Sequence, residues 1–279
     1  MKNFTNRVAV ITGAGSGIGR GLALELAERG ARLALFDINE ESVADTAAKC
    51  EKLGRTAKAY RLDVADRDDV HAHADKVMAD FGQVNLVVNN AGVGLMATVQ
   101  EMSYEDLDWL VGINFWGVVH GTKAFLPHLI ASGDGHLVNV SSAFGLVSAP
   151  TQSAYNATKF AVRGFTEALR QEMLIGKHRV GVSCVHPGGI RTNIATTSRA
   201  ADPATIDKVA ADFAKVVRTS PADAAKTILR GVRRNHARIL IGADAYLIDA
   251  VPRVIGTVYQ DLNAFGIRHS RYDVMFGGM

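Results

Sequence analysis

Short, continuously apolar runs alternate along this chain with segments in which apolar residues recur at helical spacing. Such runs are typical of strands buried on both faces of a parallel sheet, whereas strands with one wet face alternate between apolar and polar residues. We therefore predict strands over residues 7–12, 31–36, 84–88, 136–140 and 180–186, and further strands over the less apolar segments 57–62 and 238–241.

The segments between these runs are predicted to be helices. Their apolar residues recur three and four positions apart, as in 18–29, in the long segment of roughly 104–131 and in 155–174. Asn39, Asp66 and Ser220 stand at the expected starts of further helices, where a short polar side chain can accept a hydrogen bond from a first-turn N–H group. Gly30 is expected to end the first helix, because glycine readily adopts the left-handed conformation found at helix ends.

The alternation of strands and helices predicts an α/β fold, a Rossmann-type doubly wound parallel sheet of about seven strands with helices on both faces. We expect a single domain over residues 1–279, because no segment resembles a linker and no internal repeat is visible. Two segments stand apart. An insertion at about 188–219 is long for a connection between elements, and such insertions tend to be functional. An extension at about 243–279 continues beyond the last predicted strand.

Composition and charge exclude several classes of protein. The chain is 48% hydrophobic and 21% charged, which is too apolar for a disordered chain. Lys and Arg number 31 and Asp and Glu number 28, and this net charge of +3 is too balanced for a nucleic-acid-binding groove. The uncharged stretch 82–100 contains several asparagines, which argues against a membrane span. We expect neither a nucleic acid nor a membrane as partner.

The cysteines and the N-terminal segment indicate a reducing compartment. Cys50 and Cys184 cannot build a disulfide framework, and they show no metal-ligand spacing. The N-terminus lacks the apolar segment and small-residue cleavage site of a secretion signal. We therefore expect a cytoplasmic protein with no metal site.

A glycine-rich turn separates the first predicted strand from the first helix. It runs Thr-Gly-Ala-Gly-Ser-Gly-Ile-Gly over residues 12–19 and departs from the strict G-x-G-x-x-G pattern. Glycines let the backbone approach a pyrophosphate, whose charge then meets the N–H groups at the helix N-terminus, although a tight strand–helix corner alone would also use them. The expected cofactor contacts here are Gly13, Gly15, Ser16, Gly17, Ile18 and Gly19.

Asp37 ends the second predicted strand, where an acidic side chain reaches the adenosine ribose hydroxyls in folds of this class. A carboxylate there accepts from two hydroxyls and repels a 2′-phosphate, so NAD is favoured over NADP. Arg20 could still reach a phosphate, which leaves NADP open. Further contacts with the adenosine half are expected from Ile38 and from Asp63 and Val64 at the end of the third strand.

Tyr155 and Lys159 stand one helical turn apart on the same face of a predicted helix. Such a pair alone also occurs on protein surfaces, so its neighbours matter. Ser141 and Ser142 end the fifth predicted strand, at the carboxyl edge where open α/β sheets bind ligands. The same edge carries Asn-Asn-Ala-Gly over 89–92 and His-Pro-Gly over 186–188.

In this combination the chain resembles the short-chain dehydrogenase/reductase family in its compact, single-domain form. The resemblance extends from about residue 5 to about residue 242 and rests on residues 12–19, Asp63, residues 89–92, Asn114, Ser142, Tyr155, Lys159, Pro187 and Gly188. It implies that Tyr155 is the catalytic acid/base and that Lys159 activates it. It implies also that Ser142 polarises the carbonyl and that Asn114 holds a proton-relay water.

The resemblance further implies a dinucleotide cofactor and a homo-oligomer. The expected cofactor contacts beyond the glycine turn are Asn90, Ala91, Gly92, Tyr155, Lys159, Pro187, Gly188, Ile190 and Thr192, the last at the nicotinamide carboxamide. Family members are commonly dimers or tetramers built on the helices that correspond to 104–131 and 152–174.

The chemistry that these residues permit is hydride transfer with a proton passed to or from Tyr155. A free tyrosine has a pKa of about 10, too high for a base near neutrality. Lowering that pKa sufficiently requires about 3–4 kcal/mol in favour of the phenolate. An ammonium about 4–5 Å away supplies this at an effective dielectric constant of about 20. We therefore expect Lys159 to lower the pKa of Tyr155.

The substrate side of the predicted edge is mostly apolar. This favours a hydrophobic secondary alcohol or ketone, with bulky ones included, over an acid or a phosphorylated sugar. The segment 190–218 could act as a lid that orders on binding. The expected substrate contacts are Ser142, Phe144, Gln152, Tyr155, Gly189 and Ile194.

Three alternatives remain beside an NAD-dependent alcohol or ketone oxidoreductase. The first is an NADP(H)-dependent ketone reductase of the same family. The second is a non-catalytic module that senses dinucleotides, which explains the glycine turn and Asp37 but gives Tyr155, Lys159 and Ser142 no role. The third is a methyl transferase, since a glycine turn and an acidic strand end can also hold S-adenosylmethionine.

Overall fold

The computed structural model describes residues 1–194, 196–202, 204, 206, 211 and 217–269. Within this part of the chain the central sheet has seven strands, β1 (Val8–Thr12), β2 (Arg32–Asp37), β3 (Ala57–Arg61), β4 (Leu86–Asn89), β6 (Gly135–Val140), β7 (Val180–Pro187) and β9 (Arg238–Ile241). The helices that cover it are α1 (Gly17–Glu28), α2 (Glu40–Glu51), α3 (Arg67–Phe81), α5 (Gly117–Ala131), α6 (Ser153–Ile175) and α8 (Pro221–Arg233).

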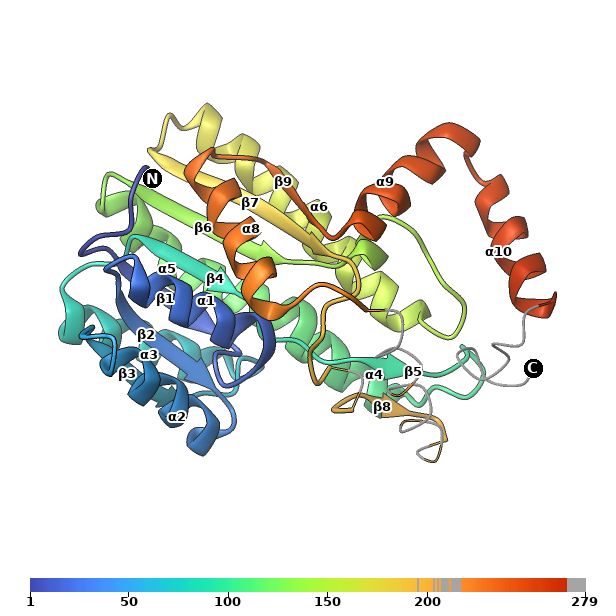
Figure 1. The fold of residues 1–279 in the computed structure, drawn as a ribbon, viewed down its shortest axis with the longest axis horizontal. Coiled ribbons are helices and arrows are strands. Elements are labelled where there is room, and N and C mark those ends of the chain that lie inside the picture. The colour runs from blue at the N-terminus through green and yellow to red at the C-terminus, as the bar shows by residue number, and fades with distance from the viewer. Residues whose placement is uncertain (195, 203, 205, 207–210, 212–216, 270–279) are drawn as a thin grey trace.

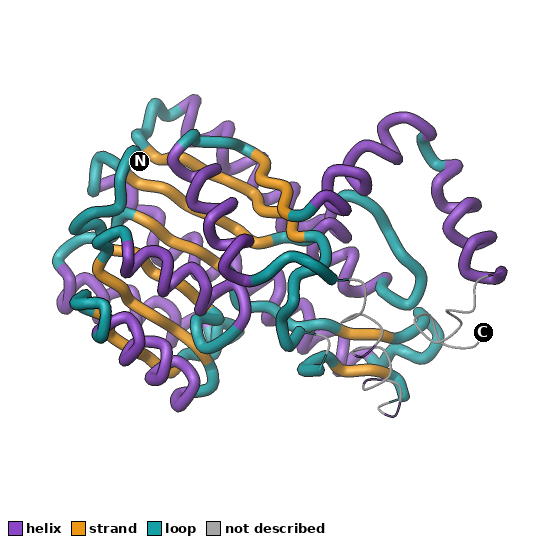
Figure 2. Tube along the Cα trace, viewed as in Figure 1, coloured by secondary structure: helices purple, strands orange, loops and turns teal. Residues whose placement is uncertain are grey.

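Every strand pair in the central sheet is parallel, and the strand order is β3-β2-β1-β4-β6-β7-β9. Figures 1 and 2 show the strands starting on the side marked N, with helices in front of and behind the sheet. This is the predicted doubly wound α/β fold, and the prediction is confirmed. The order reverses between β1 and β4, and ligands of open α/β sheets bind beyond the carboxyl ends of the strands at such a point.

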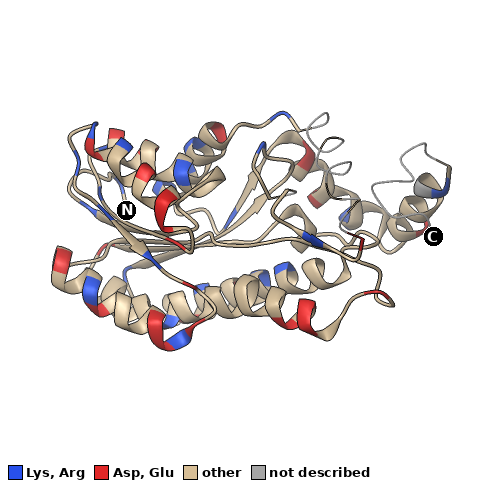
Figure 3. Cartoon of the chain, turned by 90° about the horizontal axis from the view of Figure 1, so that it is seen from below, with Lys and Arg blue, Asp and Glu red and all other residues tan. Residues whose placement is uncertain are grey.

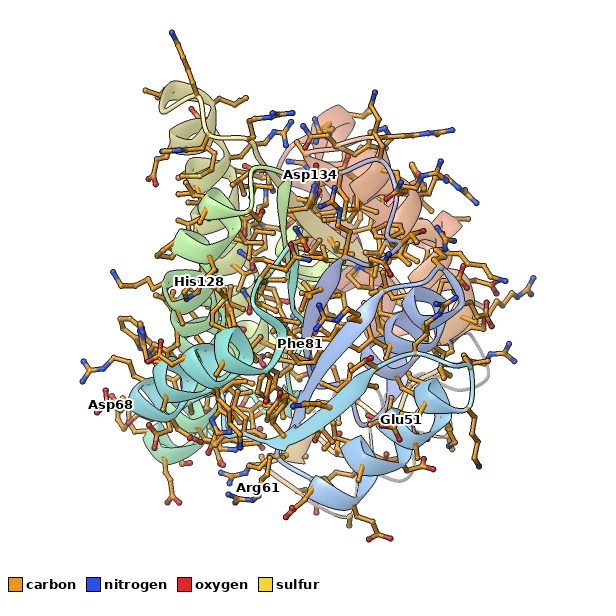
Figure 4. All side chains as sticks on the ribbon, turned by 90° about the vertical axis from the view of Figure 1, so that its left-hand side faces the viewer. Glu51, Arg61, Asp68, Phe81, His128 and Asp134 are labelled. Carbon is orange, nitrogen blue, oxygen red and sulfur yellow. The ribbon has the colours of Figure 1, made fainter. Side chains whose placement is uncertain are left out.

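The two faces of the sheet bury separate hydrophobic cores. Along β1, Ala9 and Ile11 belong to the core shared with α1, α2 and α8, whereas Val8 and Val10 belong to the core shared with α3, α5 and α6. Figure 4 shows the two helix layers on opposite sides of the twisted strands. A strand that is buried on both faces needs apolar residues at every position, which explains the continuous runs in the sequence.

The predicted helix caps are confirmed by the hydrogen bonds. Asn39 accepts from the N–H of Ser42, Asp66 accepts from two first-turn N–H groups, and Ser220 accepts from the N–H of Asp223. Gly30 has a φ of 87°, in the left-handed region, just after α1 ends. These local signals fix the residues at which the helices begin and end.

The structure differs from the sequence prediction between 104 and 131. The predicted helix is interrupted there, because α4 (Tyr104–Val111) and α5 are separated by a π-helical turn, Gly112–Trp116. A second, two-stranded sheet was not predicted. It pairs β5 (Leu95–Met96) with β8 (Arg199–Ala200) from the predicted insertion. Strands this short carry no periodicity that a sequence pattern could register.

The predicted extension forms an arm of two helices. Residues Ala243–Ile255 (α9) and Val258–His269 (α10) project from the carboxyl end of the sheet in Figure 1. The rest of the extension, 270–279, and much of the insertion lie outside the described residues. The division into one domain, an insertion and an extension therefore remains a prediction.

Charged side chains of both signs are interspersed on the two helix layers. Figure 3 shows blue and red residues side by side on the helices above and below the sheet, in keeping with the small net charge of +3. No helix in the described residues is long and apolar enough to span a membrane. In the same part of the chain, no cluster of three or more His, Cys, Asp or Glu residues could hold a metal ion.

Candidate active site

The turn between β1 and α1 can form only with glycine at its critical positions. Gly13 and Gly17 have φ angles of 64° and 50°, in the left-handed region that side chains disfavour. A Cβ atom at Gly19 would overlap the carbonyl group of Gly13, because the first turn of α1 packs directly on the start of the loop. The N–H groups of that first turn have no partners within the helix. The backbone here fits a pyrophosphate.

Asn90, which follows β4, fastens this turn to the centre of the sheet. Its side-chain Nδ2 donates to the carbonyl oxygens of Thr12, at 2.9 Å, and Gly13, at 3.2 Å. In return the Thr12 hydroxyl accepts from the N–H groups of Asn90 and Ala91, each at 3.0 Å. The segment after β4 is thus held against the glycine turn at the point where the strand order reverses.

Asp37 lies beside the same turn, at the end of β2. Its carboxylate accepts from the N–H of Gly15 at 2.9 Å and from the N–H of Asn39 at 3.0 Å. Arg20, the residue that left NADP open, points to α2 instead. Its Nη2 atom lies 3.2 Å from the carbonyl oxygen of Ser42 and 3.1 Å from the Asp45 carboxylate.

The end of β3 lies next to Asp37. The N–H of Leu62 donates to the Asp37 carbonyl oxygen at 2.9 Å, which brings the following residues to the same corner. Asp63 accepts from the N–H of Ala65, and Val64 is buried. Ile38 is 57% exposed beside them. The residues predicted for the adenosine half therefore come together.

Tyr155, Lys159 and Ser142 meet at the carboxyl edge of the sheet. The Lys159 side chain is buried, with its Nζ atom 3.3 Å from the carbonyl oxygen of Val140 and 5.5 Å from the centre of the Tyr155 ring. The Ser142 hydroxyl accepts from the N–H of Phe144 at 3.1 Å and lies close enough to the Tyr155 phenol to lower its pKa, and Phe144 contacts the Tyr155 ring edge-on at 6.4 Å between centroids. Helix α6 and the end of β6 thus bring a phenol, an ammonium and a hydroxyl together.

Burial and Ser142 act in opposite directions on the pKa of Tyr155. Burial raises this pKa, and the interaction with Ser142 lowers it by less. Burial also lowers the pKa of Lys159 to about 8. In the chain by itself, burial outweighs the other influences on the phenol, and the expectation that Lys159 lowers the tyrosine pKa stays a prediction.

Asn114 lies in the π-helical turn and is fully buried. Its Oδ1 accepts from the N–H of Val93 and its Nδ2 donates to the carbonyl oxygen of Val93, both at 2.9 Å. It also lies 3.4 Å from the Thr158 hydroxyl of α6. A Cβ atom at Gly92 would contact both Asn114 and the Lys159 ammonium, so the three residues share one small space.

Two residues at this edge support the others and were not assigned by sequence reasoning. His186, at the end of β7, lies with its Nδ1 atom 2.9 Å from the carbonyl oxygen of Ser142. The Ser141 hydroxyl donates to the carbonyl oxygen of Lys159 at 2.8 Å. The sequence signal for His186 is its place at the end of an apolar run, immediately before Pro187.

The chain after β7 folds back over the glycine turn. Ile190 is buried and forms an isolated bridge with Thr219. A Cβ atom at Gly17 would lie 3.1 Å from the Thr192 side chain, so Thr192 packs on the turn predicted to hold phosphates. Pro187 is the last residue of β7, and Gly188 and Gly189 connect it to these residues.

The small β5–β8 sheet covers the other flank. Ser198 donates to the carbonyl oxygen of Ile194 at 2.7 Å, and Arg199 lies 2.8 Å from the Asp106 carboxylate of α4. The Arg199 guanidinium also stacks 4.0 Å from the centre of the Trp109 ring. Gln152 precedes α6 and accepts through its carbonyl oxygen from the N–H of Asn156. Of the residues predicted to contact the substrate, Phe144 directly touches the Tyr155 ring.

A family model for short chain dehydrogenases matches residues 7–203. The chain belongs to this family. It is 52% identical over 268 residues to the putative oxidoreductase SadH of Mycobacterium tuberculosis, which covers 96% of this chain and 97% of the relative. It is 39% identical over 196 residues to estradiol 17-beta-dehydrogenase 11 of Mus musculus, covering 68% of this chain and 64% of that protein.

Solved structures share the fold over nearly the whole chain. A short-chain dehydrogenase/reductase from Burkholderia phymatum in complex with NAD has a TM-score of 0.83 and 31% identity, and the match covers 97% of this chain and 98% of that one. An alcohol dehydrogenase from Thermococcus sibiricus, in complex with 5-hydroxy-NADP, has a TM-score of 0.71 and 27% identity, with 85% and 94% covered. The predicted family is thereby confirmed.

Proposed function

We propose that this chain transfers hydride between NAD(H) and a hydrophobic secondary alcohol or ketone. The observation that carries the proposal is the meeting of the Tyr155 phenol, the Lys159 ammonium and the Ser142 hydroxyl beside a glycine turn. A dinucleotide-sensing module would need the turn alone. A methyl transferase would need no such phenol–ammonium pair.

A nicotinamide dinucleotide fits the residues at this edge. The glycine turn leaves room and N–H groups for a pyrophosphate, and Asp37 offers carboxylate oxygens at the adjacent strand end. NAD is favoured over NADP because a 2′-phosphate would meet the Asp37 charge while Arg20 is engaged with Asp45. Solved relatives are described with NAD and with 5-hydroxy-NADP, so the family accommodates both cofactors.

The proton chemistry is assigned to Tyr155. A bound, oxidised nicotinamide would supply the acceptor for the hydride of the alcohol carbon, and its positive charge would favour the phenolate. The Tyr155 oxygen takes the hydroxyl proton as that carbon becomes a carbonyl, and the reverse transfer reduces a ketone. The Ser142 hydroxyl donates a hydrogen bond to the substrate oxygen, where negative charge develops.

Lys159 and Asn114 support this transfer. The buried Lys159 ammonium favours the ionised phenol, since little water screens it. The resemblance gives Asn114 a proton-relay water. Both polar atoms of the Asn114 side chain are committed to Val93, so we assign that water to a backbone group of the π-helical turn.

The substrate is proposed to be apolar and bulky. Phe144 lies against Tyr155, and the buried Leu95, Leu146 and Val147 are apolar neighbours along the same segments. These side chains offer dispersion contacts and no cationic partner for an acid or a phosphate. A relative named for estradiol supports a large hydrophobic secondary alcohol as the class to test first.

We further propose a homo-oligomer in the cytoplasm. Trp116 and Phe160, near the start of α5 and on α6, are 49% and 38% exposed, and large exposed apolar side chains are typical of association surfaces. Light scattering after size-exclusion chromatography is expected to give a dimer or a tetramer. A monomer at micromolar concentration would contradict the proposal.

Replacing Tyr155 with Phe tests the function. We expect turnover to fall below detection in a panel of hydrophobic ketones and secondary alcohols, read from the absorbance of reduced nicotinamide. NADH binding, read from tryptophan fluorescence, should persist because the glycine turn is untouched. Unchanged turnover would reject Tyr155 as the acid/base, and wild-type binding of S-adenosylmethionine without NADH would reject the function.

A further inference from the structure

Asp244 lies in the first turn of α9, outside the segments that carry the predicted site residues. Its Oδ2 atom accepts a hydrogen bond of 2.6 Å from the N–H of Gly189. Gly189 belongs to the chain that follows β7, so the hydrogen bond joins the C-terminal arm to the cofactor edge. The neighbouring N–H of Gly188 is held separately, by the carbonyl oxygen of Ile241 at 2.9 Å.

The Asp244 carboxylate lies against two glycines, Gly188 and Gly242, and a side chain at either position would overlap it. A Cβ atom at Gly188 would overlap both carboxylate oxygens, and one at Gly242 would overlap Oδ1. Gly242 also has a φ of 92°, which L side chains rarely adopt. Two glycines from distant parts of the chain thus close around one acidic side chain, so its position is sterically defined.

Stabilisation of its own helix does not account for this contact. An acidic residue in a first turn gains from the helix dipole without a hydrogen bond to another segment. Here the carboxylate, although exposed, reaches out of α9 to an N–H group of another segment, and its charge strengthens that hydrogen bond relative to a neutral one. The side chain therefore fixes the turn at Gly188 and Gly189.

That turn leads directly to the cover of the glycine loop. Two residues after it, Arg191 donates through its N–H to Thr219, and Thr192 packs against Gly17. In the proposed function, Pro187 to Thr192 contact the nicotinamide half of the cofactor, whereas Asp37 contacts the adenosine half. A less firmly held turn would thus weaken the contacts with the nicotinamide half of the cofactor and leave those with the adenosine half unchanged.

We propose that Asp244 is a positioning residue that holds the Gly188–Gly189 turn against the nicotinamide half of the cofactor. The proposal rests on the proposed function, because it assigns this turn to a dinucleotide. It makes the C-terminal arm, through α9, a part of the cofactor site.

The test compares NADH with ADP-ribose, which lacks the nicotinamide. In the full chain, Asp244→Ala is expected to weaken NADH binding about tenfold, the loss of a charge-assisted hydrogen bond, while ADP-ribose binding changes less than about twofold. Asp244→Asn, which keeps an acceptor, should recover part of the loss. Asp249→Asn is the matched control, because Asp249 lies on the same helix and pairs with Arg238 and Arg253.

Fluorescence titration gives both affinities, and a thermal melt of each variant checks folding. Equal weakening of NADH and ADP-ribose would indicate a merely structural role and overturn the proposal, as would unchanged binding of both. If Asp244→Ala does not fold, Asp244→Asn carries the same comparison. If the wild-type chain binds neither ligand, the proposed function itself fails and the role of Asp244 fails with it.

Discussion

The imidazole of His186 lies directly behind Ser142, with 2.9 Å between His186 Nδ1 and the Ser142 carbonyl oxygen. A carbonyl can only accept, so Nδ1 carries the hydrogen in this contact. Burial lowers the pKa of His186 to about 4, and the imidazole is therefore neutral near pH 7. The residue proposed to polarise the substrate is thus held from the neighbouring strand by a neutral donor.

Replacing His186 with Ala should displace Ser142. We expect kcat to fall about tenfold, the loss of one buried hydrogen bond felt in the transition state, with little change in the affinity for NADH. His186→Asn places an amide donor near Nδ1 and should retain most of the activity. Steady-state kinetics together with NADH titration measure both quantities, and equal losses in the Ala and Asn variants would contradict this role.

Stability should decrease in mild acid because two buried histidines resist protonation. Burial lowers the pKa of His136 to about 3 and that of His186 to about 4, whereas an unfolded histidine titrates near 6.5. A depressed folded pKa gives stability that is complete above about 6.5 and is lost as pH falls toward the folded value. As the pH falls from 7.5 to 5, each of the two histidines should lower the free energy of unfolding by about 2 kcal/mol.

His136→Gln isolates one of these contributions. The Ser183 hydroxyl donates to the carbonyl oxygen of His236 at 2.6 Å and accepts from Nε2 of His136, a contact that a glutamine amide can replace. Urea unfolding at pH 7.5 and pH 5 measures the fall in the free energy of unfolding between them. This fall should be about 2 kcal/mol smaller in the variant than in the wild-type chain. His71→Gln, on the exposed surface of α3, is the control. An unchanged pH dependence in His136→Gln would refute the assignment.

The central fold was predictable because each signal was local. Continuous apolar runs marked strands that are buried on both faces, and Asn39, Asp66 and Ser220 marked helix starts through contacts within three residues. The glycine turn was also recognisable, since positive φ angles at Gly13 and Gly17 restrict the residue type itself.

The unpredicted features depend on contacts between distant segments. The β5–β8 pair joins residues about a hundred positions apart and has two residues in each strand. His186 and Asp244 are hydrogen-bonded to Ser142 and Gly189 across the fold, and the sequence shows neither contact, although His186 precedes the Pro-Gly pair. The π-helical turn Gly112–Trp116 carries Asn114, whose side chain is hydrogen-bonded to Val93 on another segment. Sequence patterns do not encode such pairings.

Asp37→Ala should shift the cofactor preference. Removing the carboxylate removes both the acceptor for ribose hydroxyls and the charge that repels a 2′-phosphate, so the ratio of NADP to NAD affinity should rise by at least about tenfold. Paired titrations with NADH and NADPH measure the ratio. Asp75→Ala, an exposed carboxylate on α3, controls for the change in net charge. An unaltered ratio would remove the argument for NAD.

Arg199 holds the β5–β8 sheet at the substrate side of the site. Its replacement should weaken substrate binding and leave cofactor binding unchanged. Its guanidinium pairs with Asp106 at 2.8 Å and stacks on Trp109 at 4.0 Å from the ring centre. Exposed ion pairs and cation–π contacts are individually weak, so Arg199→Ala should raise KM about three- to tenfold with NADH affinity unchanged. Arg199→Lys keeps the charge and loses the planar stacking, so an intermediate KM is expected. A fall in NADH affinity that matches the rise in KM would mean that Arg199 supports the whole fold and not the substrate side alone.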